Sequence, residues 1–252
     1  MKKKVSLIAF AIIIVLIMTV YITAHHYFGL MNERPIFSCK QHQDDTLRLA
    51  IIGDSWAFYH HDYDVSLAQQ LSEKTHHPVK TSTYGLCGAT SKEVYCSIFE
   101  DETLHRLLKN GFDYCFLSVG INDTYKKMGA DYYAHHTTLI LRFLLQNGIS
   151  PIILEIPDYD INFAYEHQTS GRKCLRQLSM LITNSSLDCR QDYRQALRKR
   201  LDEAHIAQQI ALIPNLQWPM RLYLSDRMHL NEKGYKVLDY CLTSIIAKHC
   251  IK

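Results

Sequence analysis

The sequence has few of the residues that mark several large classes of protein. Its 252 residues include only 10 glycines and 6 prolines, with no internal repeats and no low-complexity tracts, which excludes collagen-like and disordered chains. Neither sign of charge is in excess: 28 Lys and Arg face 25 Asp and Glu, and three of those cations are Lys2, Lys3 and Lys4. Because the rest of the chain is neutral overall, we expect no basic face and no nucleic-acid partner.

The sequence also lacks any Cys-x-x-Cys pair, although it contains eight cysteines. A structural zinc site is therefore not expected, and nothing in the sequence indicates a cofactor. Eight cysteines fit an oxidising compartment. Nearness in sequence favours two disulfides, Cys87–Cys96 and Cys174–Cys189, and the second would bracket a loop-like insertion.

One long apolar run without a charge covers residues 5–24. A helix over these residues is about 30 Å long, which matches the hydrocarbon core of a bilayer. A cleaved signal peptide is the alternative, but its apolar region is normally about 7–15 residues long, and Ile22-Thr23-Ala24 is a poor cleavage site. We expect a cytoplasmic stub over 1–4 and a single membrane anchor over 5–24. With the three lysines inside, the remaining chain lies on the extracytoplasmic side.

The rest of the chain predicts a short polar stalk over 25–45 and one domain over 46–252, a common domain size. Strands are expected over 47–52, 78–83, 112–119, 151–156 and 209–213. Helical patterns cover 64–76, 102–109, 131–147, 192–206 and 231–248. This alternation predicts a three-layer α/β/α sandwich around a mostly parallel five-stranded sheet. In such a fold, reactive side chains gather in the loops at the carboxyl ends of the strands.

Four short motifs stand at those places. They are Gly53-Asp54-Ser55-Trp56, residues 85–91, Gly120-Ile121-Asn122-Asp123 and Asp226-Arg227-Met228-His229. In this order the motifs resemble the SGNH (GDSL) hydrolase family, which is named for a Ser, a Gly, an Asn and a His in four blocks. The resemblance spans about residues 47–247, nearly the whole predicted domain. It implies a flavodoxin-like fold and serine hydrolase chemistry.

Each block implies a role for one or two residues. Ser55, on a strand-to-helix turn, is the candidate nucleophile, and His229 is the base that removes its proton. Asp226 precedes His229 by three residues, so its carboxylate can hold one ring nitrogen while the other faces Ser55. By the resemblance, the oxyanion hole consists of the backbone amides of Ser55 and Gly88 and the side-chain amide of Asn122.

Two positions depart from the family pattern, and two others allow a second interpretation. Gly85 competes with Gly88 for the oxyanion role, and Gly88 is preferred because Gly-x-Thr-Ser commonly closes that block. Trp56 stands where many members have Leu, and Thr83 where an Asn often stands. Asn122 also begins a glycosylation sequon, but its place in the third block favours catalysis. These departures weaken assignment to a subfamily rather than the chemistry.

Residues close to the blocks are candidates for substrate contact. Trp56, Tyr59 and His60 follow the nucleophile closely, and Asp158 follows the fourth predicted strand at the same edge of the sheet. Residues 161–190 look like an insertion over this edge and predict a lid. Pairs of adjacent histidines are interpreted as surface or loop residues rather than metal ligands, because neighbouring side chains point in different directions.

The sequence therefore predicts a membrane-anchored serine esterase that acts outside the cytoplasmic membrane. Exported members of the family it resembles often act on O-acetylated glycans, so removal of O-acetyl groups from an envelope or extracellular glycan is the favoured reaction. The alternatives are an O-acetyltransferase and a lipid esterase or thioesterase, although no long apolar loop suggests a fatty-acyl tunnel. A non-catalytic binding module is disfavoured because all residues of the triad and the oxyanion hole are present.

Overall fold

The computed structural model describes residues 2–215 and 218–250, except for the side chains of residues 2–9 and 11. The chain divides into two compact units, Met1–Asn32 and Glu33–Lys252. All four motifs and every described strand belong to the larger unit.

The smaller unit consists mainly of helix α1 (Lys2–Phe28). The predicted cytoplasmic stub and membrane anchor both fall on it, and part of them lies outside the described residues, namely Met1 and the side chains of 2–9 and 11. No helix in the described part of the chain is both long enough and apolar enough to span a membrane. The anchor therefore stays a prediction.

Residues 29–46, the larger part of the predicted stalk, form neither helix nor strand. From Glu33 onward, however, they belong to the larger unit rather than preceding it. The ring of Phe37 packs on that of Phe143 with centroids 4.9 Å apart, and the backbone N–H of Cys39 donates to Asn147 Oδ1 at 2.8 Å. These contacts fasten the segment to the domain, so the compact unit begins well before the predicted boundary at residue 46.

A five-stranded sheet forms the centre of the larger unit. Its strands are β1 (Leu47–Gly53), β2 (Val79–Gly85), β3 (Tyr114–Ser118), β4 (Ser150–Leu154) and β5 (Ala211–Ile213). They lie in the order β2-β1-β3-β4-β5, and each neighbouring pair is parallel. This is the flavodoxin-like order. The predicted number of strands and their parallel pairing are confirmed.

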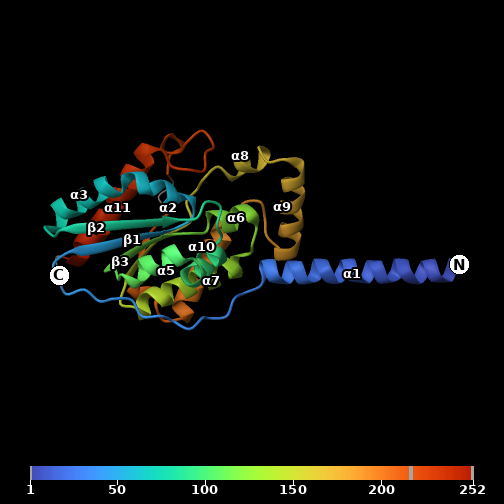
Figure 1. Ribbon diagram of the computed structural model, residues 1–252. Helices are drawn as coiled ribbons and strands as arrows, with labels where there is room; N and C mark the ends of the chain where they lie inside the picture. The colour runs from blue at the N-terminus through green and yellow to red at the C-terminus, as the bar shows by residue number, and fades with distance from the viewer. Residues whose placement is uncertain (1, 216–217, 251–252) are drawn as a thin grey trace. The chain divides into compact units, whose positions relative to one another are not determined.

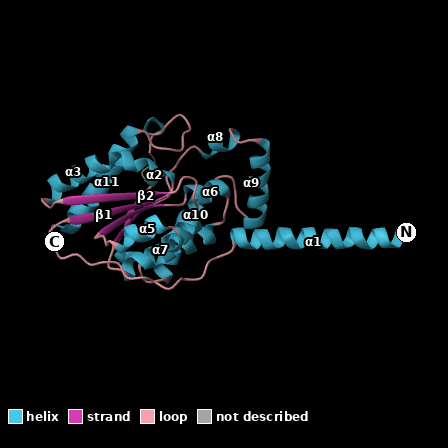
Figure 2. Ribbon diagram, in the orientation of Figure 1, coloured by secondary structure: helices cyan, strands magenta, loops and turns pink. Residues whose placement is uncertain are grey.

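Helices cover both faces of the sheet (Figure 1, Figure 2). One face carries α3 (Asp64–Thr75) and α11 (Glu232–Cys250). The opposite face carries α4 (Ser91–Glu100), α5 (Glu102–Lys109), α7 (Ala130–Gln146) and α10 (Arg190–Glu203). The three-layer α/β/α architecture is therefore confirmed, and α4 is the one large helix of the layers that the sequence patterns did not predict.

Further helices lie in the connections around this framework. The α-helices among them are α2 (Ser55–His60), α6 (Ile121–Lys126), α8 (Ile161–Glu166) and α9 (Ser170–Thr183). Single 3-10 turns cover η1 (His61–Tyr63), η2 (Ala207–Gln209) and η3 (Met220–Leu222). Helices α2 and α6 begin directly after β1 and β3, whereas α8 and α9 fill the predicted insertion at 161–190.

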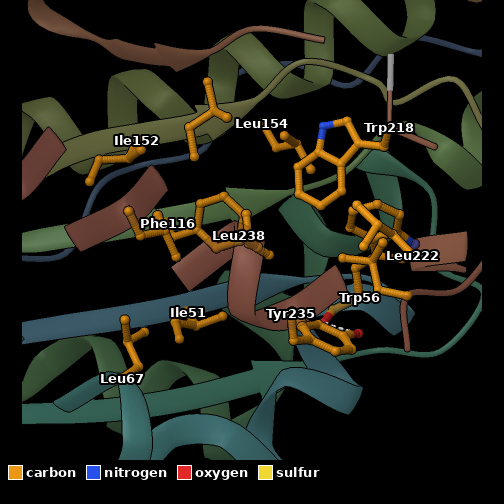
Figure 3. Close-up of a cluster of buried hydrophobic side chains, with 14 of the residues drawn as sticks. Ile51, Trp56, Leu67, Phe116, Ile152, Leu154, Trp218, Leu222, Tyr235 and Leu238 are labelled. Atoms are coloured by element: carbon orange, nitrogen blue, oxygen red, sulfur yellow. Dashed lines mark hydrogen bonds between the residues drawn. The ribbon is translucent and has the colours of Figure 1, made fainter. Parts of the chain in front are cut away.

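The core between the sheet and α11 explains why the inner strands are rich in apolar residues. Ile51, Phe116 and Ile152 project from three neighbouring strands toward Leu238 of α11 (Figure 3). All but one of the seven residues of β1 are buried, because a parallel sheet with helices on both faces has no solvent-facing side. Burial of this core supports the carboxyl ends of β1 and β3, where two motifs stand.

All eight cysteines lie among the described residues, and all are free thiols. The predicted Cys87–Cys96 and Cys174–Cys189 disulfides are therefore absent from the structure. Cys189 is buried, and its Sγ accepts a hydrogen bond from Lys127 Nζ at 3.7 Å, whereas Cys174 is exposed on α9. Nearness in sequence was a poor guide because it does not fix where a side chain points: the Cys189 thiol is directed to Lys127 inside the domain, whereas Cys174 is on the surface.

Candidate active site

The candidate nucleophile stands at a tight turn between β1 and α2. A Cβ on Gly53 would lie only 2.0 Å from the carbonyl oxygen of Ser118 on β3, so the close approach of the two strand ends requires glycine. Asp54 then begins α2 as its N-cap, because its carboxylate accepts the backbone N–H of Trp56 at 3.0 Å. Ser55 is thus fixed as the first residue of a helix at the carboxyl edge of the sheet.

The structure brings the three predicted triad residues together. Ser55 Oγ lies 2.9 Å from His229 Nε2, and His229 Nδ1 lies 2.6 Å from Asp226 Oδ2. When the Nδ1–H group donates a hydrogen bond to the carboxylate, Nε2 carries no proton and can accept the hydroxyl proton of Ser55. This is the geometry that general-base activation of a serine requires.

Asp226 lies in the same loop as His229, the candidate base. Its Oδ1 accepts the backbone N–H groups of Met228 and His229 at 2.9 and 3.0 Å, while Oδ2 accepts the imidazole. Burial raises the pKa of Asp226, but the hydrogen bonds from His229 and from the two backbone amides outweigh it and leave the pKa below its usual value. The carboxylate is therefore charged and stabilises a protonated His229.

Gly88 and Asn122, the other two predicted oxyanion donors, line the same cavity as Ser55. Gly88 has φ = +77°, and a Cβ there would meet nothing within 4 Å, so the left-handed backbone rather than crowding favours glycine. Gly85 does not line the cavity, because it ends β2 and packs against the backbone of Phe58. The structure therefore supports Gly88 over Gly85.

Two buried carboxylates support the Asn122 side of the cavity. Asp54 Oδ2 lies 3.5 Å from Asn122 Nδ2, a long contact, and Asp123 accepts the backbone N–H and the hydroxyl of Ser91 at 2.9 and 2.6 Å. Burial raises the pKa of Asp54 to about 7 and that of Asp123 to about 6. Both residues therefore act as parts of the scaffold that positions the first and third motifs.

The triad and the oxyanion candidates open into one cavity of about 360 Å³. Its lining comprises Ser55, Tyr59, Cys87, Gly88, Asn122, Tyr125, Phe163, Ala164, His167, Asp226, Met228 and His229. Phe163, Ala164 and His167 come from α8 or from the residue directly after it. The predicted insertion therefore does border the site, through α8 rather than α9.

Of the four predicted substrate contacts, only Tyr59 lines the cavity. Its ring lies edge-on to His229, with centroids 5.4 Å apart. Trp56 is instead buried in the core (Figure 3), where its indole N–H donates to the carbonyl of Met228 at 3.1 Å. The prediction for Trp56 as a substrate contact is wrong, and the residue supports the loop that carries the catalytic base.

The prediction for His60 as a substrate contact is also wrong, whereas the one for Asp158 stays a prediction. His60 is fully buried and faces α11, where its Nε2 lies 2.7 Å from Asp239 Oδ1. Burial lowers its pKa, but the carboxylates of Asp239 and Asp64 outweigh this effect and raise the pKa to about 8. Asp158 lies outside the cavity lining, since it pairs with Arg194.

Sequence reasoning missed most of the side chains that shape the cavity. The missed lining residues are Cys87, Tyr125, Phe163, Ala164, His167 and Met228. Cys87 and Met228 stand inside the second and fourth motifs, so their position was a signal that could have found them. The remaining four depend on how α6 and α8 turn toward the cavity. In the described part of the chain, no group of three or more His, Cys, Asp or Glu side chains could hold a metal ion.

No family model matches the sequence, and no curated protein matches it either. The structure is similar to several solved structures at low sequence identity. A GDSL-like lipase from Bacteroides thetaiotaomicron has a TM-score of 0.52 and 17% identity, covering 80% of this chain and 88% of that one. A lipase/acylhydrolase from Enterococcus faecalis has a TM-score of 0.51 and 14% identity, with 81% and 96% covered.

An acetyl xylan esterase is similar to the same extent, with a TM-score of 0.53, 18% identity, and coverage of 79% of this chain and 100% of that chain. At such identities the likeness concerns the fold alone. This chain therefore has the fold of the SGNH (GDSL) lipases and acylhydrolases.

Proposed function

We propose that this protein is a serine esterase that hydrolyses oxygen esters through Ser55. The observation that carries the proposal is the continuous hydrogen-bond chain from Ser55 Oγ through His229 to Asp226, which opens into a cavity of about 360 Å³. Gly88 and Asn122 line the same cavity. A nucleophile, its base, the group that orients the base and candidate oxyanion donors are thus together at one site.

The reaction has two halves. Ser55 Oγ forms a bond to the ester carbonyl carbon while its proton passes to His229 Nε2, and the carbonyl oxygen becomes an oxyanion. The amides of Ser55, Gly88 and Asn122 are the proposed donors to that oxygen. When the intermediate collapses, the bond to the alcohol oxygen breaks, and the alcohol leaves with the proton from His229. Water then attacks the acyl-enzyme in the same way, which releases the acid and restores Ser55.

An O-acetylated glycan is the substrate class that we propose. The cavity lies near the lower end of the range of roughly 300–1,000 Å³ that holds small molecules, which suits a small acyl group better than a fatty-acyl chain. Tyr59 and Tyr125 on its wall are aromatic surfaces of the kind that pack on sugar rings. One protein with this fold is an acetyl xylan esterase, which supports the same class.

The test compares the full chain with Ser55→Ala, using p-nitrophenyl acetate as the ester. We expect the variant to lose at least about 10⁴-fold in kcat, because it lacks the hydroxyl that is hydrogen-bonded to His229 Nε2. Ser66→Ala, which changes an exposed serine of α3, is the matched control and should keep full activity. Equal rates for the wild type and Ser55→Ala would contradict the proposal.

A second assay separates hydrolysis from transfer, since the acyl-enzyme could also pass its acyl group to a sugar hydroxyl. The enzyme is given p-nitrophenyl acetate together with xylo-oligosaccharides, and the products are weighed by mass spectrometry. Hydrolysis predicts free acetate with unmodified oligosaccharide. Acetylated oligosaccharide in excess of acetate would replace the hydrolase with the alternative, an O-acetyltransferase.

We further propose that the catalytic unit works on the extracytoplasmic side of a membrane to which the chain is anchored. The support is in the sequence: Lys2, Lys3 and Lys4 precede the uncharged apolar run over 5–24, an arrangement that leaves the lysines in the cytoplasm. Alkaline carbonate extraction should leave the protein in the membrane pellet, and protease added outside intact cells should reach the catalytic unit. Release of a shortened chain into the soluble fraction would instead indicate a cleaved signal peptide.

A further inference from the structure

A stack of three side chains joins the loop of the catalytic base to helix α8. The guanidinium carbon of Arg227 lies 4.3 Å from the centroid of the Phe163 ring, and the imidazole of His167 stacks on that ring with centroids 3.9 Å apart and planes at 29°. Two groups this close to one ring would collide on the same face. Arg227 and His167 therefore cover opposite faces of Phe163, and the ring is clamped between them.

A second set of contacts from the same arginine fixes the start of α8. Arg227 Nη1 forms an ion pair with Asp160 Oδ2 at 2.8 Å, and the carbonyl of Arg227 accepts the backbone N–H of Asp160 at 3.1 Å. Asp160 is the N-cap of α8, since its Oδ1 accepts the backbone N–H of Phe163 at 3.0 Å. Arg227 thus holds both the cap of the helix and the ring that the helix presents to the cavity.

Arg227 has a backbone conformation that is unfavourable for a residue with a side chain. Its φ is +56°, in the left-handed region, where a side chain costs free energy that glycine would avoid. Arg227 itself does not line the cavity, whereas Phe163 and His167 do. Because Arg227 contacts Phe163 and Asp160 but not the cavity, we treat it as a positioning residue.

We propose that Arg227 sets the acyl-chain specificity of the site by holding Phe163 rigidly as one wall of the cavity. The inference rests on the proposed esterase function and deepens it. The cavity of about 360 Å³ must hold the acyl group and the adjoining part of the alcohol at once. A clamped ring leaves room for esters of short acids, such as acetate, and excludes longer chains. Once the clamp is released, Phe163 can turn aside and admit them.

The test measures kcat/KM for p-nitrophenyl acetate, butyrate and hexanoate with the full chain and two variants. Arg227→Gly suits the left-handed backbone and removes the stack, whereas Arg227→Lys keeps a charge for Asp160 but has no planar group to lie on Phe163. We expect the hexanoate-to-acetate ratio to rise about 10-fold in Arg227→Gly, the scale of a changed apolar pocket wall, and by a smaller factor in Arg227→Lys. Arg106→Lys is the matched control, because Arg106 forms an exposed pair with Glu102 on α5.

A double-mutant cycle shows whether Arg227 acts through the ring. In a Phe163→Ala background, where the wall is already missing, Arg227→Gly should change the ratio no further. A ratio in both Arg227 variants within twofold of wild type, or equal effects of Arg227→Gly with and without Phe163, would overturn the inference while leaving the esterase intact. If the wild type hydrolyses none of the three esters, the proposed function itself fails, and the inference fails with it.

Discussion

Asp54 and Asp226 stand one residue before the nucleophile and three residues before the base, yet their surroundings are opposite. The side chain of Asp226 is 48% exposed and accepts three hydrogen bonds from its own loop, while Asp54 is fully buried. Accordingly, the pKa of Asp226 lies below its usual value, and burial raises that of Asp54 to about 7.

The difference shows how the same residue type can fill two roles in one site, one electrostatic and one structural. A carboxylate that must stabilise positive charge on His229 needs to be ionised, and its loop supplies the donors that keep it so. A carboxyl group that caps α2 beneath the cavity has no such need, since a neutral or charged oxygen can accept the N–H of Trp56. We therefore expect Asp226 to matter for rate and Asp54 for stability.

Asp226→Asn should have the largest effect on rate. The amide cannot stabilise the imidazolium and favours the wrong tautomer of His229, so kcat for p-nitrophenyl acetate should fall on the order of 10³–10⁴-fold. The melting temperature should change little, because the side chain is about half exposed. A variant with near-normal kcat would show that His229 is oriented by other groups, and the assignment of Asp226 to the triad would be wrong.

Asn122→Ala tests whether Asn122, which contacts Asp54, is a donor to the oxyanion. Losing one oxyanion donor typically costs about 10²–10³-fold in kcat, with little change in KM because the donor acts on the transition state. Asn122→Asp is the matched variant, since it keeps the size but offers no N–H₂ group. If both variants changed KM alone, Asn122 would be a binding residue rather than an oxyanion donor.

Most strands and the candidate triad could be predicted from the sequence because both leave strong local signals. A strand buried on two faces is rich in apolar residues, as at residues 49–52 of β1, and Ser55 stands in the motif that follows this strand. Helix α4 was missed, although Thr90 and Glu93 form the capping box that begins it. That pair of residues was a usable signal.

Most of the side chains that line the cavity could not be predicted, because their positions depend on helix rotation and on distant partners. Tyr59 and His60 are neighbours in sequence, but a helix turns about 100° per residue, which directs one ring to the cavity and the other to Asp239 of α11. The wall formed by Phe163 depends on a short helix held in place by Arg227, more than 60 residues away. Local patterns carry no trace of either arrangement.

Asp54→Asn isolates the scaffold role, because asparagine caps a helix as well as aspartate does. The folded-state pKa of Asp54, about 7, is above the unfolded value of roughly 3.9. Its contribution to stability is therefore fully present below about pH 4 and is lost as the pH rises through about 7. We expect the stability advantage of wild type over Asp54→Asn in urea unfolding to shrink between pH 5 and pH 8.

A matched set of measurements on Asp226→Asn sharpens the contrast. The pKa of Asp226 is lowered on folding, so its contribution is present above the unfolded pKa and is lost as the pH falls through the folded value. The stability difference between wild type and Asp226→Asn should therefore grow as the pH rises, whereas the difference between wild type and Asp54→Asn should shrink. If stability followed the same pH trend in both variants, the pKa values of Asp54 and Asp226 would not be shifted in opposite directions. The contrast between the buried and the exposed carboxyl group would then be wrong.

The smallest effect on kcat is expected from Trp56→Phe. This variant tests whether the hydrogen bond from Trp56 to Met228 helps to position the loop that carries Asp226 and His229. The indole N–H of Trp56 donates to the carbonyl of Met228, next to His229. Trp218 packs on Trp56 with ring centroids 6.0 Å apart (Figure 3), but within the described residues its buried indole nitrogen has no hydrogen-bond partner. Trp218→Phe is therefore a control that changes the packing and removes no such bond.

Both substitutions should lower the melting temperature by similar amounts, since each removes part of a buried ring system. Only Trp56→Phe should also lower kcat, by a few-fold, because the Met228 carbonyl loses a donor worth about 1 kcal/mol and His229 is held less firmly. Equal kcat in the two variants would show that the loop keeps its position without this bond. In that case the hydrogen bonds that Asp226 accepts within its own loop are sufficient to hold His229 against Ser55.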